Sequence, residues 1–311
     1  MRCLLLFCCG KTKLEDLKAV SSDKNNPNII FVLLESTINI SRVKELNILE
    51  NPWKKYNSIP LKVFSTGGGT WIAEYSILHG VDPSIYGPHY HHIHLLGPIS
   101  QLSGRIAPSL QSLGYQTSTI SPMEKDFYNS EIFHKSLGIQ NFMACEDLKV
   151  CKHKNREQVD KIVFTKIIET IKKSKNPEFI FGLTISQHSP HLKTSNAPKL
   201  LCNSALNIEL CNEFSEYIKR EEELKLNIDH FINEINLLAE DSIVVFFGDH
   251  IASSFSNIPE TEATANNPNY ETIAFAYESK TKKFVNLKEL LSNCHTNFKI
   301  SVSDLDVLAL K

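Results

Sequence analysis

Four polar segments directly follow apolar runs of the chain, and each carries a residue type that can take part in catalysis. Glu35 closes the run IIFVLL, and Thr70 follows three glycines in the loop after LKVF. His188 lies in QHSPH after FIFGLTIS, and Asp249-His250 follows SIVVFFG. If these runs are parallel strands, their carboxyl ends meet at one edge of a sheet, where α/β proteins bind ligands. We therefore expect a single site built from four distant segments.

The residue types of these segments indicate metal-dependent chemistry on a phosphate ester. Carboxylates and imidazoles are the ligands that zinc or manganese accept in proteins. The glycines before Thr70 allow the backbone to approach a substrate oxygen closely, and a helix that begins at Thr70 offers unpaired N–H groups to a phosphate. A metal ion at the Thr70 oxygen would lower the pKa of this hydroxyl and make it a nucleophile.

Strand and helix patterns alternate along the chain. Continuous apolar runs predict strands buried on both faces, at 29–35, 179–186 and 242–248. Weaker patterns predict further strands at 61–64, 115–121 and 272–277, and residues 287–291 complete the predicted core. Helical spacing and glycine stops predict helices at 71–79, 106–113, 131–137, 156–173 and 212–238. The alternation predicts an α/β fold, a three-layer sandwich whose mostly parallel central sheet has helices on both faces.

Length and charge restrict the organisation of the protein. The 311 residues suit one main domain, and the formal net charge of −2 gives no basic surplus for a nucleic-acid partner. We divide the chain into an N-terminal stub, 1–25, and a catalytic domain, 26–311. The stub begins with MRCLLLFCCGK, whose apolar run is too short to span a bilayer. We interpret it as a segment that packs or frays, or as the remnant of a membrane anchor.

Eight cysteines bear on the cellular compartment. Cys145 and Cys151 form one close pair, Cys202 and Cys211 form another, and neither pair has the C-x-x-C spacing of a zinc knuckle. Close pairs in polar segments favour two local disulfides and an oxidising compartment over free thiols in the cytosol.

Two further segments have a less specific composition. Residues 88–94, PHYHHIH, are rich in histidine, which suits an accessory metal site, but we favour an exposed loop that lies apart from the four strand ends. The dense charges of 219–225 are interpreted as a solvated helix face. The polar, Asn-rich residues 259–268 predict a loop.

The motifs NIIFVLLES, GGGTWIAEYSILHG, SQHSPH and VVFFGDH occur in this order between residues 28 and 250. Together with FYN at 127–129 and LG at 137–138, they resemble the sulfatase-fold branch that contains lipoteichoic acid synthase and phosphoglycerol transferases. The two cysteine pairs also resemble those of the related phosphoethanolamine transferases, which act in the periplasm. The resemblance implies an alkaline phosphatase-like fold and a periplasmic or extracytoplasmic location, with a membrane association or a membrane-anchored partner; a cytoplasmic location is the alternative.

The resemblance also implies roles for single residues. Glu35, Thr70, Asp249 and His250 would bind one divalent ion, manganese, zinc or magnesium. Thr70 would form a covalent phospho-intermediate, and His188 would hold the substrate phosphate or assist the leaving group. Three further residues are expected to contact substrate: Tyr128, Trp71 and His191.

The chain departs from the family pattern at two positions. Ser130 stands where many lipoteichoic acid synthase relatives place an arginine that contacts phosphate, which puts the substrate head group in doubt. Ile251 stands where a glycine is common in the wider superfamily. The residues after Thr70 also lack the C/S-x-P-x-R context in which true sulfatases form formylglycine, so sulfate ester cleavage is disfavoured.

These observations favour a transferase. It would move a phosphoglycerol- or phosphoethanolamine-type group from a lipid- or glycan-linked donor to an envelope glycan or lipid. A hydrolase of the same fold, a phosphodiesterase, a phosphatase or a sulfatase-like enzyme, is the alternative. A non-catalytic envelope-binding domain is the alternative of another class, and the intact set of four residues argues against it.

Overall fold

The protein was analysed as a computed structural model, which describes residues 26–65, 67–80, 82–96, 106–153, 155–203, 206–255 and 271–287. The N-terminal stub, the loop predicted at 259–268 and all but the first residue of the segment predicted at 287–291 lie outside the described residues.

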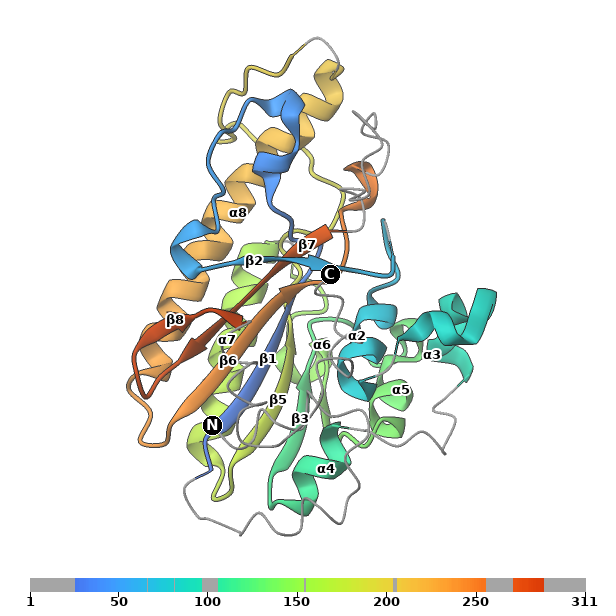
Figure 1. The fold of residues 1–311 in the computed structure, drawn as a ribbon, viewed down its shortest axis with the longest axis vertical. Helices are drawn as coiled ribbons and strands as arrows, with labels where there is room; N and C mark the ends of the chain where they lie inside the picture. The colour runs from blue at the N-terminus through green and yellow to red at the C-terminus, as the bar shows by residue number, and fades with distance from the viewer. Residues whose placement is uncertain are drawn as a thin grey trace.

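Eight strands form one mixed sheet, shown in Figure 1. They are β1 (Asn28–Leu34), β2 (Ile59–Lys62), β3 (Gln116–Ile120), β4 (Asn141–Met143), β5 (Glu178–Leu183), β6 (Ser242–Gly248), β7 (Glu271–Glu278) and β8 (Lys283–Val285). The order across the sheet is β2-β7-β6-β1-β5-β3-β4, and β8 pairs with β7. The pairs among β6, β1, β5, β3 and β4 are parallel, whereas β7 runs antiparallel to each of its neighbours. The predicted mostly parallel sheet is confirmed.

Seven α-helices are described: α2 (Thr70–His79), α3 (Ile93–Leu96), α4 (Ile106–Ser112), α5 (Ser130–Ser136), α6 (Cys145–Leu148), α7 (Arg156–Lys173) and α8 (Ile208–Ile235). Short 3-10 helices connect several elements, at 40–42, 44–46, 54–56, 83–92, 127–129 and 253–255. Five of the α-helices match those expected from the sequence to within a few residues, and α7 has the predicted bounds. Among the described helices, none combines the length and apolar character needed to cross a membrane.

The sheet separates two apolar cores. Successive side chains of β1 point to opposite faces. Phe31 and Leu33 therefore pack with α2, α4 and α5 on one face, and Val32 packs with α7 and α8 on the other. The rings of Phe164 on α7 and Phe231 on α8 stack with centroids 4.8 Å apart. Helices thus cover both faces (Figure 1), as the predicted three-layer sandwich requires.

The charged stretch 219–225 is only partly a solvated face: Glu222 and Glu223 are exposed as predicted, but other charges of the stretch are buried. Glu221 is 1% exposed and Lys225 is 8% exposed, and their side chains form an ion pair at 3.6 Å. Arg220 is turned toward the loop after β5, as described below. Pairing makes the burial of these charges tolerable, and a sequence pattern does not reveal such partners.

Gly248, the last residue of β6, lies so close to the backbone of Thr37 that its replacement should destabilise the fold. A Cβ atom on Gly248 would lie 2.3 Å from the Thr37 carbonyl oxygen, whereas one on Gly182 of β5 would meet the flexible end of Ile167 at 2.8 Å. Backbone cannot give way as a side-chain end can, so Gly248→Ala should lower the free energy of unfolding by about 3 kcal/mol and Gly182→Ala by about 1 kcal/mol. Urea unfolding measures both, and equal losses would contradict this account.

Candidate active site

Glu35, Thr70, Asp249 and His250 come together at the carboxyl ends of β1 and β6. The Thr70 hydroxyl donates to Glu35 Oε2 at 3.2 Å and lies 3.3 Å from His250 Nε2. Glu35, Asp249 and His250 are each less than 5% exposed, and their ligand atoms lie within 4.8 Å of one another. The structure therefore gathers the four residues that the sequence singled out for one site.

Strand register and a tight turn bring the two carboxylates together. Leu34 pairs with Gly248 across the parallel β1 and β6, so the next residues, Glu35 and Asp249, lie side by side. Ser36 then adopts a left-handed conformation with φ of 49°. Its N–H donates to Asp249 Oδ1 at 2.8 Å, and its hydroxyl donates to Glu35 Oε1 at 2.8 Å. One residue thus orients both carboxylates.

The glycine loop places Thr70 at the beginning of α2. Gly68 and Gly69 have φ of 134° and 85°, which side chains rarely allow, and Gly69 is the N-cap. Thr70 is consequently the first residue of a ten-residue helix whose amino end borders the cavity described below. Unpaired N–H groups and the helix dipole at such an end favour an anion.

The cluster places two carboxylates next to a single histidine. His250 Nδ1 donates to the Ile251 carbonyl oxygen at 2.8 Å, so the lone pair of Nε2 faces Asp249 Oδ2 at 3.1 Å in the neutral ring. Asp249 Oδ2 is buried and accepts no hydrogen bond from the protein. Burial, and then the charge of Glu35, raises the pKa of Asp249 to about 6. Burial alone would lower the pKa of His250, but Asp249 and Glu35 outweigh it and raise this pKa.

These observations fit a divalent metal ion. A cation among Glu35, Asp249 and His250 would satisfy the orphaned carboxylate oxygen and accept the Nε2 lone pair. Two carboxylates and one imidazole, with a hydroxyl beside them, are a donor set suited to zinc, manganese or magnesium.

A cavity of about 640 Å³ opens over this cluster. His188, predicted to act on the substrate, lines it, as do Trp71 and Tyr128. The two aromatic rings lie 4.4 Å apart between centroids. Tyr128 has φ of 48°, unusual for a bulky residue and a form of strain that concentrates at functional sites. Its side chain is 51% exposed, so the strained turn presents the phenol at the mouth of the cavity.

His191 lies elsewhere. It is fully buried, its ring stacks on Phe255 at 5.1 Å, and its Nε2 donates to the Gln187 carbonyl oxygen at 2.9 Å. Burial lowers the pKa of His191 to about 4. His191 therefore does not line the cavity, where we expected it to contact substrate. This histidine instead supports the segment that carries His188.

The histidine-rich segment is closer to the site than the sequence indicated. It ends a 3-10 helix at Pro83–His92 and continues into α3, rather than forming a loop. Tyr90 and His91 line the cavity, and the His91 carbonyl oxygen accepts a hydrogen bond from Trp71 Nε1 at 2.9 Å. His94 is buried against the Trp71 ring, with centroids 4.3 Å apart. The prediction that this segment lies apart from the site is therefore wrong.

The loop after β5 is held in place by three charged residues that the sequence analysis did not identify. Asp160 on α7 accepts hydrogen bonds from the N–H groups of Ile185 and Ser186, at 2.6 and 3.2 Å. Arg220 on α8 donates to the carbonyl oxygens of Ser186, His188 and Pro190, at 3.2–3.3 Å. Arg156 donates to the carbonyl oxygens of His188 and Ser189. No local motif marks these residues, because each lies at least 25 residues from the loop it holds.

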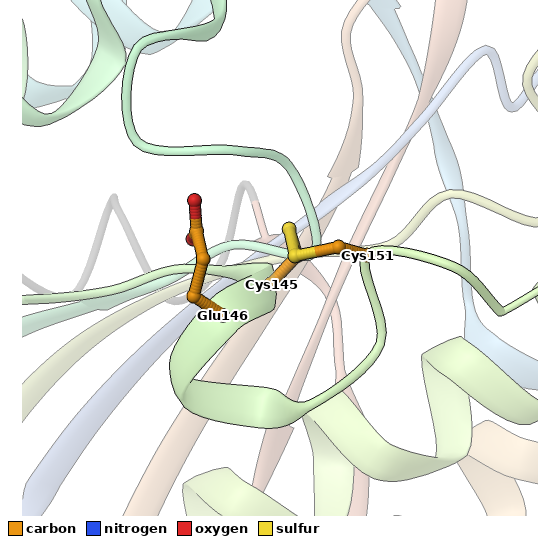
Figure 2. Close-up of side chains that lie close together, drawn as sticks. All are labelled: Cys145, Glu146 and Cys151. Atoms are coloured by element: carbon orange, nitrogen blue, oxygen red, sulfur yellow. A yellow bond between two sulfur atoms is a disulfide. The ribbon is translucent and has the colours of Figure 1, made fainter.

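Both predicted disulfides are present. Cys145 bonds to Cys151 and Cys202 bonds to Cys211. Figure 2 shows Glu146 beside the first disulfide, a grouping that resembles a set of metal ligands. Its sulfur atoms are bonded to each other and offer no thiolate, so this cluster is no metal site.

Comparison with known proteins places the chain in a family. A family model described as Sulfatase matches residues 27–299, so this chain belongs to the sulfatase family. An uncharacterized protein of Haemophilus influenzae is 23% identical over 94% of this chain and 55% of its own length. Lipoteichoic acid synthase-like YvgJ of Bacillus subtilis is 23% identical over 73% of this chain and 37% of its own length. The chain thus spans about half or less of these relatives.

Solved structures share the fold. Streptococcus pyogenes phosphoglycerol transferase GacH, in complex with sn-glycerol-1-phosphate, has a TM-score of 0.66 at 19% identity, covering 97% of this chain and 84% of that chain. The zinc complex of the C-terminal periplasmic domain of Escherichia coli EcEptC has a TM-score of 0.56 at 13% identity, covering 82% and 73%. The predicted sulfatase family and the predicted alkaline phosphatase-like α/β fold are confirmed.

The clamp on the loop after β5 is testable by hydrogen exchange. Asp160→Ala removes the acceptor of two backbone N–H groups. Burial raises the pKa of Asp160 to about 7, so exchange is measured at about pH 8, where the carboxylate is mostly ionised and hydrogen bonds to it contribute about 1.5–3 kcal/mol. Amide exchange at Ile185 and Ser186 should therefore accelerate about 10- to 100-fold. Lys161→Ala, at the exposed neighbouring position of α7, is the control. Unchanged protection in Asp160→Ala would show that the carboxylate does not hold the loop.

Proposed function

We propose that this protein is a metal-dependent phosphotransferase that moves a phosphoglycerol- or phosphoethanolamine-type group to a glycan or lipid of the cell envelope. The observation that carries the proposal is the position of the Thr70 hydroxyl. It begins a helix and lies 3.2 Å from Glu35 and 3.3 Å from His250, beside the cavity. The donor would be a phosphate ester linked to a lipid or glycan.

Glu35, Asp249 and His250 would hold one divalent ion next to Thr70, with manganese, zinc and magnesium as the candidates. The EcEptC structure contains zinc, which supports that candidate. When bound, the ion would neutralise negative charge on the phosphoryl oxygens and on the Thr70 oxygen.

The residues of the site would then take separate roles in the reaction. The Thr70 oxygen attacks phosphorus, and its proton passes toward Glu35, which already accepts its hydrogen bond. The bond between phosphorus and the leaving alcohol breaks, and His188 provides the proton for that oxygen. In the second step, an acceptor hydroxyl gives its proton to His188 and attacks the phosphothreonine. The bond between phosphorus and the Thr70 oxygen breaks, and the proton taken up by Glu35 returns to Thr70. The amino end of α2 holds the nonbridging oxygens through its N–H groups.

Two alternatives to a transferase remain: a hydrolase, which differs in the second step, and a binding domain, which carries out no catalysis. With water as acceptor, the same residues give a phosphodiesterase or phosphatase. A non-catalytic envelope-binding domain would have no need for a partly buried nucleophile among metal ligands, and the complete cluster argues against it. Two disulfides support an extracytoplasmic location over a cytoplasmic one.

Removal of the nucleophile tests the mechanism. Thr70→Ala should lower the turnover of a chromogenic phosphodiester by about 10⁴-fold or more, because the covalent step is lost, while the variant retains about one divalent ion per chain. Turnover with supplied manganese or zinc and metal content are measured together. Ser76→Ala on the same helix, whose hydroxyl donates to the Ile72 carbonyl oxygen, is the control. Full activity of Thr70→Ala would exclude this nucleophile.

Metal binding has a separate thermal test. An ion that binds only the folded chain should raise the melting temperature, and a chelator should reverse the rise. Supplied at about 100 times its Kd, the ion would add about 2.7 kcal/mol to the free energy of unfolding. Asp249→Asn removes one ligand charge and should abolish most of this response. An equal response in Asp249→Asn would place the ion elsewhere.

A further inference from the structure

Large apolar side chains are exposed around the beginning of α8, and the chemistry proposed above does not use them. Leu192 is 73% exposed, Leu201 is 82% exposed and Ile208, the first residue of α8, is 73% exposed. Figure 1 shows the beginning of α8 at the upper end of the molecule, beyond the sheet. The two leucines belong to residues 192–203, which we call the leucine loop. This loop continues the segment that carries His188 at the wall of the cavity.

Contacts with α8 bring these apolar side chains together. The lysine after Leu192 donates a hydrogen bond from Nζ to Asn212 Oδ1 at 2.7 Å. The cysteine after Leu201 forms the disulfide with Cys211. Positions three and four apart on a helix share one face, so Cys211 and Asn212 lie on the same face of α8 as Ile208. The two leucines and the isoleucine therefore gather on one side of the first turn of α8.

The leucine loop is fixed in its exposed position. Glu216, further along α8, accepts hydrogen bonds from the N–H and the hydroxyl of Thr194 at 2.9 and 2.8 Å. The hydroxyl of Ser215 donates to the carbonyl oxygen of the loop's proline. Leu200 packs against the apolar cluster beneath the loop, which directs its neighbour Leu201 outward. The exposure of the leucines thus follows from the folded structure of the loop.

The composition of the leucine loop favours a lipid surface over a protein partner. Lys193 and Lys199 are exposed, and the loop contains no aspartate or glutamate. The exposed Glu209 on the first turn of α8 leaves this region with a surplus of positive charge. Protein interfaces are enriched in tyrosine, tryptophan and arginine and depleted in lysine, whereas the loop contains lysine and none of the other three. Leucines next to lysines suit the boundary between acyl chains and anionic headgroups.

We propose that the leucine loop, together with Ile208, is an interfacial docking site for a lipid bilayer with anionic headgroups. The exposed apolar side chains enter the boundary between headgroups and acyl chains, and the two lysines stay at the level of the lipid phosphates. Docking holds the segment that carries His188 close to the membrane surface. The inference concerns lipid binding and goes beyond the phosphotransfer proposed at Thr70.

Binding of the full chain to vesicles tests the proposal. Vesicles of phosphatidylcholine alone are compared with vesicles in which about one third of the lipid is phosphatidylglycerol. Wild type should bind the anionic vesicles more tightly, and added salt should weaken this binding. Leu192→Ser/Leu201→Ser should bind at least about 10-fold more weakly, because the inserted carbon atoms are lost. Lys193→Gln/Lys199→Gln should lose about 5-fold for each charge on anionic vesicles and little on phosphatidylcholine.

The matched control is Leu226→Ser/Leu237→Ser. It removes two leucines that are 67% and 74% exposed, one on α8 and one beyond its end, and it should bind vesicles as wild type does. Melting temperatures verify that each variant is folded. A second readout locates the insertion: brominated acyl chains should quench the added fluorescence of Leu201→Trp and leave that of Leu237→Trp unchanged.

Each contrary result overturns a defined part of the proposal. Equal binding by wild type and Leu192→Ser/Leu201→Ser, or quenching of Leu237→Trp in place of Leu201→Trp, would assign lipid binding to another part of the chain. Equal affinity for the two kinds of vesicle would overturn the role of the lysines. No binding to either vesicle would overturn the bilayer as the partner. Self-association that Leu192→Ser/Leu201→Ser abolishes would then assign the leucines to a contact between two copies of the chain.

Discussion

The site depends on the parallel pairing of β1 with β6, which forces Glu35 and Asp249 to be neighbours in a buried environment. Two carboxylates that cannot move apart repel each other and have lost most of their contact with water. Ser36 relieves part of this cost with two hydrogen bonds, and Thr70 relieves part with another. The negative charge that remains uncompensated favours the binding of a cation. The fold holds this unfavourable arrangement in place because the apolar strands on either side are paired along their whole length.

The cavity has walls of two different kinds. The wall formed by the ends of β1 and β6 and by the amino end of α2 is preorganised through backbone geometry, with glycines and a left-handed serine at the points where the chain turns. The wall after β5 is a loop, and it is held by charged side chains that reach in from α7 and α8. Loops position side chains less accurately than strands do. The buried aspartate and the two arginines compensate for this, since each fixes backbone atoms of the segment that carries His188.

Much of the fold and of the site could be predicted from the sequence because the signals are local. The run 243–247 is apolar from end to end, and a strand buried on both faces requires this pattern. Glu35 and Asp249-His250 each follow such a signal directly, and Thr70 follows a weaker strand pattern and a run of glycines, so these local signals led to the cluster. The antiparallel edge formed by β7 and β8 was not foreseen, because strand direction depends on pairing and leaves no local signature.

The wrong predictions for single residues have one physical cause in common. His191 follows His188 by three positions, and its sequence context suits the cavity equally well; only the packing of Phe255 and Tyr217 against its ring turns it inward. Arg220 lies in a charged stretch that is typical of a solvated helix, and its carbonyl partners belong to another part of the chain. Burial and partners that are distant in sequence decide the role of each.

The central strand β1 also precedes every other described strand in the sequence, which has a consequence for biogenesis. Both neighbours of β1 come later: β5 begins 150 residues after it and β6 begins 214 residues after it. Until they emerge, β1 presents two unpaired edges and an apolar surface from Ile29 to Leu34, the features that make a nascent segment prone to aggregate. Contacts this distant in sequence also slow folding. The chain therefore needs protection for β1 during translation, and no shortened chain that ends before β6 can assemble the cluster.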